Sequence, residues 1–217
     1  MTIVPARGRI RGPGLPCPAA SGVFRPRGIS SVEIIVALAL SATLAAATAH
    51  GTFQIQSALA VRSAAADLAA TFFRARAFAL TRGVTVGIKF RRDGGRYEWA
   101  LYRDGNGNGI RTFEIASGVD RSLGLSIAWP RSDVLPGILK DGAVPDPGSP
   151  GRQLDRPDDP IRFNNSDICS FSPVGESTPG SIYLWDGRDR MAVLRVFGRS
   201  AKVRTLYYFR GEKSWRR

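Results

Sequence analysis

The most constraining feature of this chain is an uncharged apolar stretch close to its N-terminus. From Ile34 to Val61 there is no Asp, Glu, Lys or Arg, and residues 34–49 are mainly Ala, Leu, Ile and Val. A membrane-spanning helix needs about 20 apolar residues, a length that the stretch reaches with its apolar flanks. We therefore expect a transmembrane helix over about residues 32–53. Glu33 stands at its start, where a carboxylate in lipid costs about 2–3 kcal/mol unless it is paired.

The positive charge of the chain is concentrated at its two ends. Lys and Arg number 31 against 18 Asp and Glu. The segment before residue 29 has no acid and contains Arg7, Arg9, Arg11, Arg25 and Arg27. Basic residues that flank a transmembrane helix stay on the cytoplasmic side. This rule predicts that most of the chain lies across the membrane.

An ordinary secretory signal is the alternative interpretation of the same segment. Its basic region would be 1–27, its apolar region 34–46, and its cleavage site Ala47-Thr48-Ala49, directly before His50. Glu33 counts against this interpretation, because a signal that is discarded has no evident use for a carboxylate. Composition alone leaves both interpretations open.

The residues around Glu33 follow a recognisable order. The run Gly28-Ile29-Ser30-Ser31-Val32-Glu33, followed by an apolar helix, resembles the class III signal of type IV pilins and type II secretion pseudopilins. The resemblance implies that a prepilin peptidase cleaves after Gly28 and N-methylates Ile29, while the apolar helix stays on the protein. It also implies that Glu33 pairs with the N-terminal amine of a neighbouring subunit. Such a pair would set register strongly, because a lone charge in a dry helix bundle is strongly disfavoured.

Later segments resemble the GspH/FimT branch of the pseudopilins. They are ARAFALTRGVTV at 75–86, FSPVGESTPGSIYL at 171–184 and FGRSAKVRTLYYF at 197–209. The resemblance implies an α+β, pilin-like fold, in which a long N-terminal α-helix, half of it transmembrane, packs on a C-terminal antiparallel β-sheet domain. Residues 1–28 would be a cleaved leader peptide, 29–83 the helix, and 84–217 a periplasmic β-rich domain.

Periodicity predicts the elements of the chain after the apolar stretch. One helix is expected from about Ser30 to Arg82, with Gly83 as its C-cap. Asp93-Gly94-Gly95 predicts a hairpin turn. Strands are expected at 84–90, 96–102, 123–129, 161–163, 168–172, 181–185, 190–197 and 202–209. Residues 130–160 are rich in Pro, Gly and Asp, and this composition predicts a long, mobile surface excursion.

The segment RDGNGNGIRTFEI, residues 103–115, resembles a calcium-binding loop. Asp104, Asn106 and Asn108 alternate as in an EF-type loop and are followed by a glycine. The acid expected at the twelfth position is replaced by Ile115, and Glu114 comes one place early. The sequence therefore predicts weak calcium binding at most. Gly and Asn also suit left-handed turns, so a plain loop is the alternative.

The basic C-terminal segment offers a candidate contact with DNA. Arg199, Lys202 and Arg204 lie near the predicted turn after 190–197, and four aromatic side chains follow. Cationic side chains bind phosphates and aromatic rings stack on bases. Some members of the FimT branch are implicated in DNA uptake through this hairpin. A solvated strand face, or a docking surface for an acidic neighbouring pilin, is the alternative.

The resemblance implies a minor pilin or pseudopilin of a type II secretion system or type IV pilus, which assembles into a filament or its tip. It would be a single-pass protein of the bacterial inner membrane, with its globular domain in the periplasm. Its partners would be other pilins or pseudopilins, the prepilin peptidase, the inner membrane and, for a DNA-uptake pilin, DNA. The alternative is an exported basic β-rich binding protein released after Ala49. No enzymatic activity is expected, because the sequence contains no catalytic signature, and no cofactor is expected beyond calcium.

Overall fold

The computed structural model describes residues 28, 30–124, 127–129, 132–149 and 151–217, with the side chains of 47–53 excepted. The contacts divide the chain into two compact units, Met1–Ala46 and Ala47–Arg217. The leader expected at 1–28 lies outside the described residues except for Gly28, and the expected new N-terminal residue, Ile29, lies outside them as well.

Helix α1 extends over Ser31–Arg82 and has 52 residues. It contains no Pro and ends at Gly83, whose φ of 66° is the left-handed conformation that commonly terminates a helix. Its C-terminal part buries one stripe at helical spacing. The residues of this stripe are Val61, Ala64, Ala65, Leu68, Phe72, Ala75 and Ala79.

The first sheet is antiparallel and has the strand order β3-β2-β1-β7, with β4 also paired to β2. Its strands are β1 (Val86–Asp93), β2 (Arg96–Arg103), β3 (Arg121–Ser122), β4 (Ile127–Ala128) and β7 (Ile168–Phe171). Strands β1 and β2 form the predicted hairpin, whose turn contains Gly94 and Gly95 at positive φ. Glycine reaches this conformation without steric cost, which favours a tight turn.

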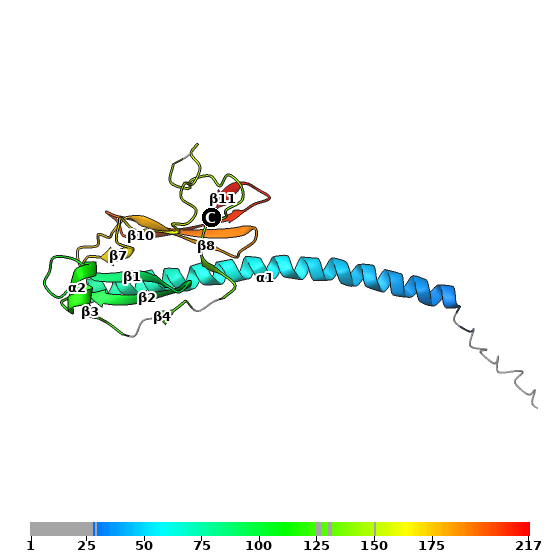
Figure 1. Cartoon of the computed structure of the whole chain (residues 1–217), viewed down its shortest axis with the longest axis horizontal. Coiled ribbons are helices and arrows are strands. Elements are labelled where there is room, and N and C mark those ends of the chain that lie inside the picture. The colour runs from blue at the N-terminus through cyan, green and yellow to red at the C-terminus, as the bar shows by residue number, and fades with distance from the viewer. Residues whose placement is uncertain (1–27, 29, 125–126, 130–131, 150) are drawn as a thin grey trace, which may run out of the picture. The chain divides into compact units, whose positions relative to one another are not determined.

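The second sheet is also antiparallel and has the order β11-β10-β9-β8-β5, with β6 paired to β8. Its strands are β5 (Leu135–Pro136), β6 (Ile161–Arg162), β8 (Gly180–Trp185), β9 (Arg190–Phe197), β10 (Lys202–Phe209) and β11 (Ser214–Arg216). The three longest strands follow one another as the predicted meander. Figure 1 shows them in orange beside the green hairpin of the first sheet.

Both sheets and the buried stripe of α1 share one apolar core within residues 47–217. Its centre is Phe72, whose ring lies 6.2–6.3 Å from the rings of Phe90, Phe163 and Phe171. Phe90 belongs to the first sheet, and Phe163 directly follows a strand of the second. The helix is therefore the element against which both sheets pack.

The predicted fold class is contradicted in two respects. The β-rich part consists of two antiparallel sheets rather than a single sheet domain. In addition, no helix within the described part of the chain is long and apolar enough to cross a membrane. This finding contradicts both the half-transmembrane helix and the single-pass placement in the bacterial inner membrane.

The excursion at 130–160 does not fit the prediction of a mobile surface segment. Val134, Ile138, Leu139 and Val144 are buried. The last three form a second apolar cluster with side chains of β8, β9 and β10. The segment therefore covers the face of the second sheet that is turned away from the main core.

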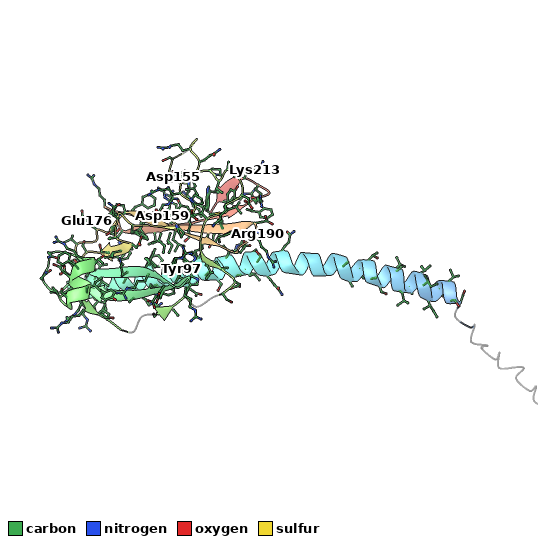
Figure 2. All side chains as sticks on the ribbon, in the orientation of Figure 1. Tyr97, Asp155, Asp159, Glu176, Arg190 and Lys213 are labelled. Atoms are coloured by element: carbon green, nitrogen blue, oxygen red, sulfur yellow. The ribbon has the colours of Figure 1, made fainter. Side chains whose placement is uncertain are left out.

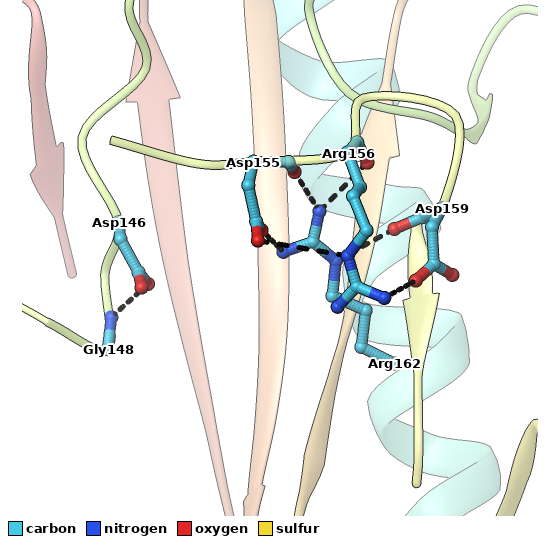
Figure 3. Close-up of polar contacts among 6 residues, drawn as sticks. All are labelled: Asp146, Gly148, Asp155, Arg156, Asp159 and Arg162. Atoms are coloured by element: carbon cyan, nitrogen blue, oxygen red, sulfur yellow. Dashed lines mark hydrogen bonds and ion pairs between the residues drawn. The ribbon is translucent and has the colours of Figure 1, made fainter. Parts of the chain in front are cut away.

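Arg162 fixes the end of this excursion, as Figure 3 shows. Its guanidinium binds the Asp155 carboxylate at 3.0 Å and donates to the backbone carbonyls of Asp155 and Arg156. It also donates to the Asp159 carbonyl at 2.8 Å. Only 17% of the Arg162 side chain is exposed, so its charge is compensated where water has limited access.

Cys169 lies in the main core with no exposed surface, and burial raises the pKa of its thiol. We expect the folded chain, carrying Cys17→Ser, to react with a thiol reagent at about pH 8 at least about 100-fold more slowly than the same chain in concentrated guanidinium. The reason is that the thiolate is the reactive form. The measurement is the rate of thiol modification. Equal rates in the two conditions would contradict the buried position.

Candidate functional site

The loop after β2 is organised by one carboxylate, that of Asp104, which is 9% exposed. Its Oδ1 accepts hydrogen bonds from the backbone N–H groups of Asn106 at 3.0 Å and Gly107 at 2.7 Å. Its Oδ2 accepts one from Gly109 at 2.7 Å. The loop therefore winds around this side chain before α2 (Thr112–Ser117) begins.

Glu114 in α2 completes the cluster. Its Oε1 accepts hydrogen bonds from the side-chain amides of Asn106 at 3.0 Å and Asn108 at 2.8 Å. Glu114 is 5% exposed, and its Oε2 is buried without a hydrogen-bond partner among the described residues. The structure thus brings the predicted residues Asp104, Asn106 and Asn108 together, and it adds the acid that stands one place early.

Sequence reasoning missed a third acid, Asp120, which is 1% exposed. Its Oδ1 accepts from the Gly105 N–H at 3.3 Å and its Oδ2 from the Arg111 N–H at 2.9 Å. Its own N–H donates to the Glu114 carbonyl at 3.1 Å. Asp120 therefore joins the two ends of the loop, at Gly105 and Arg111. The only signal in the sequence was an isolated acid two residues after Gly118, a glycine with positive φ that ends α2.

Glu33 occupies the first turn of α1 and is exposed. An acid is favourable there, because the N-terminal end of a helix carries partial positive charge. No hydrogen bond or ion pair joins its carboxylate to another described residue. Gly28 is also exposed, and a Cβ added to it would meet no atom within 4 Å.

The apolar residues on both sides of Glu33 in the sequence are exposed around the whole helix. Successive residues are rotated by about 100° around a helix axis, so these positions do not form a single stripe. They are Val32, Ile34, Ile35, Val36, Leu38, Leu40 and Leu44, each between 48% and 68% exposed. A helix that is hydrophobic all round is normally buried on all sides.

The structure places the predicted DNA contacts at the turn between β9 and β10. Arg199 and Lys202 are exposed, whereas Arg204 is partly buried and lies 5.5 Å from the ring of Phe197. The turn is attached to α1, since Ala201 is buried and its carbonyl accepts a hydrogen bond from Arg76 at 3.3 Å. DNA binding at this turn stays a prediction.

Other cations of the C-terminal segment are engaged within the protein. Arg190 lies 4.5 Å from the ring of Phe209 and is labelled in Figure 2. Arg195 donates to the Pro147 carbonyl at 2.6 Å. Arg216 pairs with Glu212 at 2.9 Å. These three arginines therefore have partners within the protein.

No protein-family model, curated protein or solved structure matches this chain. The resemblance to pilins consequently depends on the residues quoted from the sequence. A function has to be argued from those residues together with the geometry of α1 and of the loop after β2.

Proposed function

We propose that this chain is a filament subunit of the minor pilin or pseudopilin kind, serving a type II secretion system or a type IV pilus. In this proposal it assembles through residues 32–44 of α1. The corresponding helices of neighbouring pilin-like subunits pack against this segment. The proposal assigns the chain no catalytic activity.

The observation that carries the proposal is the exposure of this helical segment on all its faces. A monomer with such a surface loses the hydrophobic contribution of about 25 cal/mol for each Å² left in water. One neighbour would cover a single face of the segment. Several parallel helices in a bundle cover all faces, which is the arrangement that a helical filament core provides.

The position of Glu33 supports the same arrangement. Cleavage after Gly28 would create a positively charged amine at Ile29, four residues before the carboxylate. Within one subunit the carboxylate lies in the first turn of α1 and is exposed. A neighbour displaced along the filament axis brings its own amine to Glu33. The pair then compensates both charges in an otherwise apolar bundle.

The decisive experiment is to determine the N-terminal residue and intact mass of the protein from the cells that make it naturally. We expect a chain that begins at Ile29 and carries one added methyl group. A chain that begins at His50 would reject the filament proposal and favour the released binding protein.

Two variants distinguish cleavage by a prepilin peptidase from cleavage by an ordinary signal peptidase. A Cβ added at Gly28 meets no described atom within 4 Å, so retention of the leader in Gly28→Val would be attributed to loss of peptidase recognition. Ala49→Val disrupts the small-residue site that an ordinary signal peptidase needs. We expect Gly28→Val to block processing and Ala49→Val to leave it unchanged. The reverse result contradicts the proposal.

A further inference from the structure

We infer that the loop from Asp104 to Glu114 binds a calcium ion, with the carboxylates of Asp104 and Glu114 and the side-chain oxygens of Asn106 and Asn108 as ligands. This inference does not depend on the proposed filament function. It concerns only residues of the compact unit that contains both sheets.

The first argument is the unpartnered oxygen of Glu114. This carboxylate accepts hydrogen bonds from the amides of Asn106 and Asn108, but both go to its Oε1. Its Oε2 is buried and has no partner among the described residues. Leaving a buried charged acceptor unsatisfied costs more than leaving a neutral one. A cation between the loop and Glu114 would satisfy this oxygen.

The second argument is the lack of a compensating basic side chain. Within the described residues, none of the ion pairs includes Asp104, Glu114 or Asp120. The Lys89 ammonium approaches α2 but donates to the Ser166 carbonyl and, at 3.4 Å, to the hydroxyl of Thr112. Buried charges are normally paired or coordinate a metal.

The third argument is the order of the donors along the loop. In an EF-type loop, oxygens come from positions 1, 3, 5 and 7, and a glycine stands at position 6 for a sharp turn. Asp104, Asn106 and Asn108 take the first three positions. Gly109 takes the sixth with a φ of 91°. The next residue, Ile110, has a backbone carbonyl that can serve at the seventh.

The structure also answers the objection raised by the spacing. Glu114 is at position 11 rather than 12, but α2 brings its carboxylate against the amides of Asn106 and Asn108. No cluster of three or more His, Cys, Asp or Glu within the described residues is arranged to hold a metal. Amide oxygens therefore have to contribute. A half-turn of each Asn side chain exchanges its NH₂ donor for its oxygen acceptor.

The frame of the loop limits how far the ligands have to move. Asp120 fixes the backbone on both sides of the loop, at Gly105 and Arg111. Gly105 itself lies so close to the Val119 carbonyl that an added Cβ would collide with it.

The mixed set of carboxylate, amide and carbonyl oxygens favours Ca²⁺ over Mg²⁺, because Mg²⁺ requires a near-ideal octahedron and retains water.

The test is a calorimetric titration of CaCl₂ into the full chain, together with thermal unfolding in chelator and in calcium. With only two carboxylate ligands, the expected Kd is on the order of 10⁻⁴ M. At about 100 times that concentration, the expected rise in Tm is about 5–10 °C. MgCl₂ should give a clearly smaller rise. Absence of both binding heat and a Tm rise with calcium would overturn the inference.

Three variants assign the ligands. Glu114→Gln should weaken calcium binding at least about 10-fold, and Asn106→Asp should strengthen it by a similar factor, because affinity follows the charge of the ligands. The matched control is Glu176→Gln, which makes the same substitution at an exposed residue of the turn between β7 and β8, labelled in Figure 2. This control should bind calcium like the unmodified chain.

The order of thermal stabilities gives an independent readout. In chelator, Glu114→Gln should unfold at the same temperature as the unmodified chain or higher, because it removes a buried charge with an unpartnered oxygen. In calcium, the unmodified chain should be the more stable of the two. Unchanged calcium affinity in both Glu114→Gln and Asn106→Asp would overturn the assignment of these ligands.

Discussion

Phe72→Ala is expected to lower the free energy of unfolding by about 4 kcal/mol, the loss typical of a large side chain removed from a packed core. Phe72 has no exposed surface, and it contacts the rings of Phe90, Phe163 and Phe171. Its removal would leave a cavity between α1 and both sheets. The corresponding fall in Tm is about 8–16 °C for a domain of this size.

The adjacent residue provides a matched control for this measurement. Phe73 stands on the same helix but is 54% exposed. Phe73→Ala should therefore cost less than about 1 kcal/mol, as do most substitutions at exposed positions. Guanidinium unfolding of the full chain, followed by far-UV circular dichroism, measures both values. Equal losses for the two variants would contradict the packing of both sheets on one face of α1.

The elements that the sequence predicted well are those with strong local signals. The hairpin of β1 and β2 follows from two glycines, Gly94 and Gly95, that adopt positive φ. The meander of β8, β9 and β10 follows from three apolar runs separated by short polar turns. In both cases neighbouring strands pair with each other, so no long-range information was needed.

The excursion at 130–160 was mispredicted because composition does not reveal what a segment covers. Within β9, Ala192 and Leu194 face the main core, while Met191 and Val193 face the second apolar cluster. A strand that is apolar on both faces requires cover on both. The continuous apolar run of β9 was the signal that a further layer had to lie over it.

Only the local part of the loop after β2 was predicted, because its other contributions depend on tertiary structure. Asp104, Asn106 and Asn108 are close in sequence, and their alternation was visible. The contribution of Glu114 requires α2, which has 6 residues and is too short to produce a periodic pattern. The contribution of Asp120 depends on how the chain returns after Gly118, which is a property of the tertiary structure.

Glu33→Gln is expected to prevent incorporation of the chain into filaments while leaving its processing intact. The substitution keeps the size of the side chain and removes its charge, so the amine of the neighbouring subunit would be buried without a partner. Loss of one partner of a buried ion pair costs about 3–5 kcal/mol. This cost corresponds to a fall in incorporation of about 100-fold or more. The measurement is the amount of processed chain recovered with sheared filaments, relative to the amount left in the cells.

Two further variants separate the charge of Glu33 from its effect on the helix. Glu33→Asp keeps the carboxylate and should retain much of the incorporation. Ser41→Ala makes a small change in the same exposed segment, at a hydroxyl that donates to the Ala37 carbonyl of its own helix, and it should assemble normally. If Glu33→Gln assembled as well as Ser41→Ala, the carboxylate would not set register between subunits. If the unmodified chain never appeared in the filament fraction, the filament proposal itself would be rejected. The exposed apolar surface of α1 would then have to be covered by a partner other than filament subunits.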